Sequence, residues 1–198
     1  MRFLIIAASL ALLAACATTA PQSEPQQGIS QQIRFHPQAA LNQGEVTKSA
    51  TYHLISRDLR PAQYVALINH GSDKIVPIHA QQNIRIELER ALETQFASQG
   101  LITSPSSENT IVMAIQNALV NVKPSTLGHN ISAKVVLEIT AETSQGKLVK
   151  TYTGTHAQTE LLSPSNLDIE QALNGTVDSI LQEIAHDAEL QQYLQERF

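Results

Sequence analysis

The stretch NISAKVVLEITA, at residues 130–141, decides the fold. Its apolar side chains alternate with mostly polar ones, and a period of two is typical of a β-strand with one buried and one wet face. The turn signal Ser144-Gln145-Gly146-Lys147 follows, and residues 148–158 then alternate in the same way with many threonines. The two runs together predict a long antiparallel hairpin.

Further strands are predicted on the N-terminal side of this hairpin. Residues 51–57, 63–69 and 74–78 are short runs rich in branched and aromatic side chains, and a turn signal at His70-Gly71-Ser72-Asp73 joins the last two into a hairpin. Residues 110–122 are partly apolar on both faces, which predicts a strand in the middle of the sheet.

Two amphipathic helices are predicted at 81–99 and at 167–186. The first ends at Gly100, and the second follows the breaker and capping residues Ser163-Pro164-Ser165-Asn166. Gly175 lowers the stability of the second helix, so close packing is expected there. Asp187 can cap a last short helix. The expected fold is α+β: a mostly antiparallel sheet of about five or six strands, two main helices packed on one face, and a short C-terminal helix.

Composition describes a foldable and mildly acidic chain. Of its 198 residues, 42% are hydrophobic and 16% are charged, and the formal net charge is −5. Aromatic residues make up only 4%, tryptophan is absent, and the basic residues are scattered. These numbers leave neither a stacking platform nor a phosphate-tracking stripe, so no nucleic-acid partner is expected.

The only cysteine, Cys16, follows a segment with the order of an export signal. Residues 1–15 hold one basic residue, then an apolar run, then small residues, and the run is shorter than a membrane-spanning helix. Leu13-Ala14-Ala15-Cys16 resembles the lipobox of bacterial lipoproteins, which implies cleavage between Ala15 and Cys16 and lipidation of Cys16. Ala15-Cys16-Ala17 also fits the cleavage site of an ordinary secreted protein.

Residues 16–45 are interpreted as the lipidated cysteine and a flexible polar tether, ahead of a single domain at 46–198. Ile33, Arg34 and Phe35 interrupt the tether, either to dock on the domain or to bind a partner. No aspartate follows Cys16. By resemblance to sorted lipoproteins, this implies the periplasmic face of the outer membrane, with the lipid as the contact to the membrane.

The order of segments resembles the YajG family of bacterial lipoproteins. The resemblance is sharpest in residues 84–100 (IRIELERALETQFASQG), 130–140 (NISAKVVLEIT) and 167–194. These are hydrophobic patterns and helix-end glycines, so they specify a fold better than a function. The resemblance implies an outer-membrane lipoprotein with an α+β domain facing the periplasm, and it brings no catalytic residues.

Motifs of known chemistry are missing from the sequence. The seven histidines lack the spacing of helical zinc or di-iron sites, and no nucleophile elbow, P-loop or dinucleotide fingerprint occurs, so no metal or other cofactor is expected. The densest polar cluster holds Arg57, Asp58 and Arg60. It is interpreted either as a fork for an anion or carboxylate, or as a salt bridge at a strand end. Acidic residues near the C-terminus are interpreted as a solvated face; they are Glu183, Asp187 and Glu189.

These observations favour a noncatalytic, lipid-anchored binding or accessory module in the cell envelope, with an envelope protein or a lipid as its unknown partner. An accessory subunit of an envelope lipid or solute transport system is the first alternative, and its signature would be an apolar cavity or an uncovered sheet face. A hydrolase whose site is assembled from distant residues is the less favoured alternative, and it requires a pocket with convergent polar side chains.

Overall fold

The computed structural model describes residues 30–42, 49–71 and 74–198. Within them lie eight strands and three helices. In chain order they are β1 (Gln32–Ile33), β2 (Ala50–Asp58), β3 (Tyr64–Asn69), β4 (Ile75–Ala80), α1 (Ile84–Ser98), β5 (Leu101–Thr103), β6 (Thr110–Ser125), β7 (Gly128–Thr143), β8 (Gly146–Glu160), α2 (Asn166–His186) and α3 (Ala188–Arg197).

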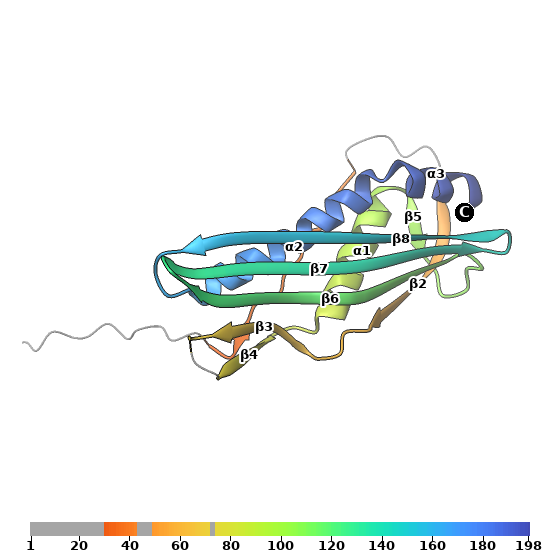
Figure 1. Cartoon of the computed structure of the whole chain (residues 1–198). Helices are drawn as coiled ribbons and strands as arrows, with labels where there is room; N and C mark the ends of the chain where they lie inside the picture. Colours follow the sequence, from red (N-terminus) through yellow and green to blue (C-terminus); the bar gives the residue numbers. More distant parts are fainter. Residues whose placement is uncertain (1–29, 43–48, 72–73) are drawn as a thin grey trace, which may run out of the picture.

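Three long antiparallel strands, β6, β7 and β8, dominate the sheet (Figure 1). The alternation in β7 buries every second residue from Ile131 to Ala141, while Ser132 and Lys134 on the other face are exposed. The predicted long hairpin is therefore confirmed. The central place predicted for residues 110–122 is confirmed too, because β6 pairs with β2, β3 and β7.

The predicted α+β class is confirmed, but the sheet is mixed, so the prediction of a mostly antiparallel sheet is wrong. The first part of β6 pairs with β2 in parallel, and Val120–Val122 of β6 pair with β3 in parallel. The pairs β1–β4 and β2–β5 are parallel as well. The reason is that the connection from β3 to β6, which contains α1, brings the chain into β6 in the same direction as β2 and β3. Hydrophobic periodicity does not record strand direction. Strands β1 and β5, of two and three residues, are too short to show a period.

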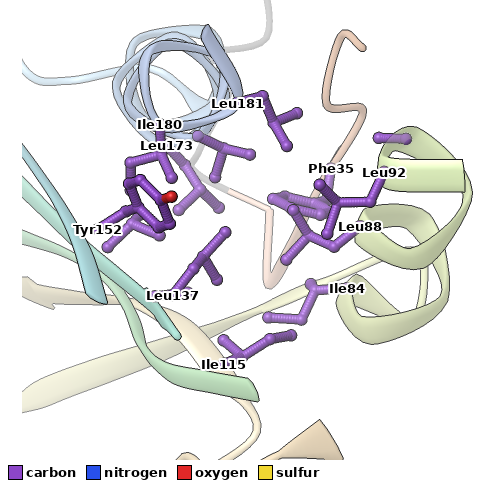
Figure 2. Close-up of a cluster of buried hydrophobic side chains, with 14 of the residues drawn as sticks. Phe35, Ile84, Leu88, Leu92, Ile115, Leu137, Tyr152, Leu173, Ile180 and Leu181 are labelled. Atoms are coloured by element: carbon purple, nitrogen blue, oxygen red, sulfur yellow. The ribbon is translucent and has the colours of Figure 1, made fainter. Parts of the chain in front are cut away.

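Side chains from both long helices meet the strands in one core. Figure 2 shows Leu88 and Leu92 of α1 and Leu173 of α2 directed toward Leu137 and Tyr152 of the sheet. All five side chains are at most 2% exposed. Burying a large apolar side chain contributes about 1.5–3 kcal/mol, so this shared core fixes both helices on the strands.

Capping residues set where the two helices begin. Asn83 accepts hydrogen bonds from the backbone N–H groups of Arg85 and Ile86 at the start of α1. Ser165 and Asp168 form a reciprocal capping box at the start of α2. Both devices satisfy N–H groups that the first helical turn leaves without partners.

Helix α2 approaches the sheet closely at Gly154 of β8. A Cβ atom added there would come within 2.8 Å of Thr176 Cγ2 and 3.0 Å of Ile180 Cγ1. The close packing expected at Gly175 is wrong, because a Cβ atom at that position would have no heavy atom within 4 Å. The glycine that allows α2 to pack closely is therefore Gly154 in β8 and not Gly175 in α2.

Candidate functional site

The predicted lipidation of Cys16 and the cleavage after Ala15 lie outside the described residues. The nearest described part of the chain is residues 30–42, here called the docked segment. It fell within the predicted tether, yet Ile33 and Phe35 are fully buried in it, while Arg34 is exposed. Of the two interpretations of these residues, docking on the domain is the one that the structure shows for Ile33 and Phe35. Figure 2 shows Phe35 beside Leu88 of α1.

A row of polar side chains on α2 binds the backbone of the docked segment. The row has a spacing of four residues, which advances about 6 Å along a helix, close to the ~6.6 Å that two residues advance in an extended chain. Acceptors on α2 therefore match the alternate N–H groups of Arg34, His36 and Gln38. The bond from Ser30 at the start of the row falls outside this two-residue spacing. The bonds run from Ser30 N to Asn166 Oδ1 (3.0 Å), Arg34 N to Glu170 Oε1 (2.7 Å), His36 N to Asn174 Oδ1 (2.9 Å) and Gln38 N to Asp178 Oδ1 (2.7 Å).

The other side of the docked segment is bound by α1 and the residues that precede it. The three bonds run from Phe35 N to Gln82 Oε1 (2.9 Å), Ala40 N to Gln95 Oε1 (3.2 Å) and Asn42 N to Ser98 Oγ (2.9 Å). The segment thus lies between α1 and α2, with apolar side chains in the core and its backbone held by amides, carboxylates and a hydroxyl. Sequence reasoning missed this arrangement. Its one sequence signal is the four-residue spacing of polar residues along α2.

Burial raises the pKa of the Asp178 carboxyl above its ordinary value. The N–H of Gln38 and the charge of His36 act in the opposite direction but do not outweigh burial. The carboxylate is therefore less well solvated than in water and is held mainly by a backbone donor.

The predicted Arg57–Asp58–Arg60 cluster is separated by the structure. Arg60 and Asp58 form a two-pronged ion pair, with 2.9 Å from Nε to Oδ1 and 2.9 Å from Nη2 to Oδ2, while Arg57 is exposed and outside this pair. Arg60 Nη1 also donates to the Tyr64 carbonyl at 3.2 Å. Burial alone would raise the pKa of Asp58, but the hydrogen bonds and charge of Arg60 hold it below its ordinary value. Arg60 thus joins the end of β2 to the start of β3, and of the two interpretations of this cluster the structure shows the strand-end salt bridge.

A small cavity of about 60 Å³ lies beside Arg60. Its lining includes Tyr64 and Asn117, and the buried Oδ1 of Asn117 has no hydrogen-bond partner within the described chain. Sites for drug-sized ligands occupy about 300–1,000 Å³, so this cavity has room for ordered water rather than for a substrate.

Two of the acidic residues near the C-terminus, Asp187 and Glu189, share the ammonium group of Lys150, and the interpretation of a solvated face is wrong for Asp187. Glu183 and Glu189 are exposed. Lys150 Nζ lies 3.1 Å from Asp187 Oδ2 and 2.7 Å from Glu189 Oε2, and the Tyr152 hydroxyl donates to Asp187 at 2.9 Å. Asp187 also caps α3. Burial and this contact with Asp187 raise the pKa of the Tyr152 hydroxyl strongly. The cluster joins the corner between α2 and α3 to β8.

Among the described residues, no group of three or more histidine, aspartate, glutamate or cysteine side chains could hold a metal ion. His156 contacts Gln158, and His186 contacts the carbonyl of Gln182 in its own helix. In the same part of the chain, no helix combines the length and apolar character needed to cross a membrane.

The architecture defines a class of α+β domain in which a long three-stranded antiparallel unit is extended by parallel strands and packed against helices. A crystal structure of a Xanthomonas campestris protein shares this fold with a TM-score of 0.55 and 10% identity, over 81% of this chain and 97% of that one. The chain belongs to a family described as uncharacterized lipoprotein, whose model matches residues 37–195. The uncharacterized lipoprotein YajG of Escherichia coli K12 is 21% identical over 166 residues, or 83% of this chain and 86% of that protein. The family resemblance in the sequence is thereby confirmed.

Proposed function

We propose that this protein is a lipid-anchored, noncatalytic lipoprotein at the periplasmic face of the outer membrane, where its body binds an envelope protein. Membership of a lipoprotein family supports the anchor. The polar clusters support a noncatalytic role, since Arg60 and Lys150 bind partners within the domain.

Strand β8 is the observation that carries the binding role. It pairs only with β7 within the described chain, and its 15 residues pair without a register shift. It therefore offers an edge of about 50 Å with the exposed threonines Thr151, Thr153 and Thr155. A free edge of this length can accept an extended segment of another protein as an added strand.

Site-specific photo-cross-linking in living cells tests this proposal. A photoreactive residue in place of Thr153 is expected to capture a defined envelope protein. The matched control carries the same residue in place of Gln171, which is exposed on α2. Each variant is compared with a Cys16→Ala chain exported by an ordinary signal, in which capture should be lost. Capture of the same proteins from both positions, or of none from Thr153, would contradict the binding role of β8.

An accessory subunit of an envelope transport system is the second candidate, and the outer sheet face favours it. One row across this face, defined by the strand registers, places Ile55, Val112 and Val149 side by side with Thr140. Val149 is 46% exposed, and Ile55 and Val112 are half-buried. A photoreactive residue in place of Val149 should capture a transport component or a lipid if this candidate is right, and neither of them if it is wrong.

A further inference from the structure

Four exposed leucines gather at one end of the molecule, here called the leucine end and defined by Leu127, Leu161, Leu162 and Leu167. Their exposed fractions are 72%, 76%, 80% and 58%. The first three are the most exposed large apolar side chains of the described chain. Single exposed leucines are ordinary, but a group of them at one end marks an interaction surface.

The sheet and the start of α2 bring these leucines together. Leu127 lies in the turn between β6 and β7, while Leu161 and Leu162 directly follow β8. The β7–β8 register ends by pairing His129 with Glu160, so the two loops lie at the same end of the strands. A Cβ atom at Gly128 would lie only 2.0 Å from the Glu160 carbonyl oxygen, which shows how close the loops are. Figure 1 shows the turn, the end of β8 and the beginning of α2 at one end of the molecule.

The docked segment begins at this same end. Ser30 N donates to Asn166 Oδ1 at 3.0 Å, and Asn166 Nδ2 donates to the Gln32 carbonyl at 3.1 Å. Asn166 directly precedes Leu167. Only 14 residue steps separate Ser30 from Cys16, so at most about 50 Å of chain joins the two. The leucine end is therefore the part of the body that an anchor at Cys16 brings first to the membrane.

The chemistry of the two loops suits an acyl-chain environment. Residues 125–128 read STLG and residues 161–165 read LLSPS, so neither loop carries a charge that would have to leave water. Leucine side chains gain free energy when they leave water for the acyl boundary of a bilayer.

We propose that the leucine end inserts into the membrane leaflet that holds the protein's own lipid anchor. The inference rests on the anchor at Cys16 from the proposed function. The leucine end then acts as a second membrane contact, which fixes how the body stands on the bilayer and turns the opposite end, with α3, away from it.

Tryptophan fluorescence tests the insertion, because the chain contains no tryptophan of its own. Leu162→Trp is made in the full acylated chain and reconstituted in vesicles of phosphatidylethanolamine with a minor share of phosphatidylglycerol. The expected result is an emission shift to shorter wavelength and loss of emission when the lipids carry brominated acyl chains. Leu127→Trp, on the other loop, should behave in the same way. Ile102→Trp is the matched control, because Ile102 is 58% exposed and lies in β5, which pairs with the start of β2 away from the leucine end. Its emission should stay that of water-exposed tryptophan.

The outcomes separate this inference from the proposed function. Mass measurement of the peptide that contains Cys16 reports acylation directly, so an absent anchor is detected without the fluorescence. If the chain is acylated and vesicle-bound but Leu162→Trp and Leu127→Trp stay unquenched, the insertion is wrong. Cross-linking of two chains through the leucine end, with both tryptophans unquenched, would also overturn it and would make a second copy the occupant.

Discussion

Two polar regions on the same helix contrast with each other. Along its middle, α2 offers Asn174 and Asp178 to the backbone N–H groups of the docked segment. At its end, Asp187 meets a lysine ammonium, a tyrosine hydroxyl and the N–H groups of α3. The pKa of Asp178 is raised, chiefly by burial, whereas the pKa of Asp187 is lowered because its hydrogen bonds and Lys150 outweigh burial.

The contrast shows what each region requires of its acidic residue. The docked segment presents N–H groups along a neutral backbone, and a neutral amide such as Asn174 can accept from them as a carboxylate does. The corner between α2 and α3 holds a cation, Lys150, and a buried hydroxyl, so it requires a negative charge. The first region therefore depends on shape and acceptor spacing, and the second depends on charge.

Phe35→Ala is expected to give the largest effect, because it breaks the docked region at its apolar contact. Phe35 is fully buried between α1 and α2, and truncation of a buried phenylalanine costs about 3–5 kcal/mol. Urea unfolding followed by circular dichroism measures the loss. The neighbouring exposed residue supplies the control, since His36→Ala should change the free energy of unfolding by about 0.5 kcal/mol or less. Equal effects of the two changes would show that the segment is not anchored by Phe35.

Asp187→Ala should have the next largest effect, at the charged corner. The change removes the cap of α3 and leaves the Tyr152 hydroxyl and Lys150 without their shared acceptor, for a loss of about 2–3 kcal/mol. Glu189→Ala removes only an exposed partner of Lys150 and should cost about 0.5 kcal/mol. Urea unfolding curves of both variants measure these losses. A loss for Asp187→Ala as small as that for Glu189→Ala would contradict the conclusion that the corner between α2 and α3 depends on the charge of Asp187.

Asn174→Ala breaks one step of the row on α2 and should cost about 1–2 kcal/mol. The side chain accepts from His36 N and donates to the Arg34 carbonyl, and both bonds are lost together. Faster proteolysis within the docked segment should accompany the loss of stability. Gln171→Ala, on an exposed part of the same helix, is the control and should leave both unchanged. Unchanged proteolysis in Asn174→Ala would mean that apolar burial alone holds the segment.

Much of the fold could be predicted from the sequence because its strongest signals are local. The alternation in β7 and β8, the central place of β6 and the apolar face of α2 each follow from residues close together in the chain. The parallel pairing of β6 with β2 and β3 could not be predicted, because it depends on how distant segments meet. The same holds for the docked segment, whose row of acceptors lies about 136 residues away.

The two polar clusters also differ in whether they join residues near to each other or far apart in the sequence. The ion pair of Asp58 and Arg60 joins residues two apart, and it was one of the two interpretations that the sequence offered. Asp187 and Lys150 are 37 residues apart in the sequence, so the acidic residues looked solvated until the fold brought the lysine to them.

The smallest effects are expected from Asp178→Asn and Asp187→Asn, which sharpen the comparison by their opposite signs. The pKa of Asp178 is raised in the folded state, so the free energy of unfolding falls as the pH rises from the ordinary aspartate pKa through the folded-state pKa. The neutral amide of Asp178→Asn should therefore stabilise the protein at pH 7, by less than about 1 kcal/mol. The lowered pKa of Asp187 contributes stability above the ordinary aspartate value, and this is lost as pH falls through the folded pKa. Asp187→Asn should therefore destabilise at pH 7. Unfolding curves from pH 7 to about pH 3 should show both differences from the wild type shrinking toward acid, and differences of the same sign would contradict the contrast between the two regions.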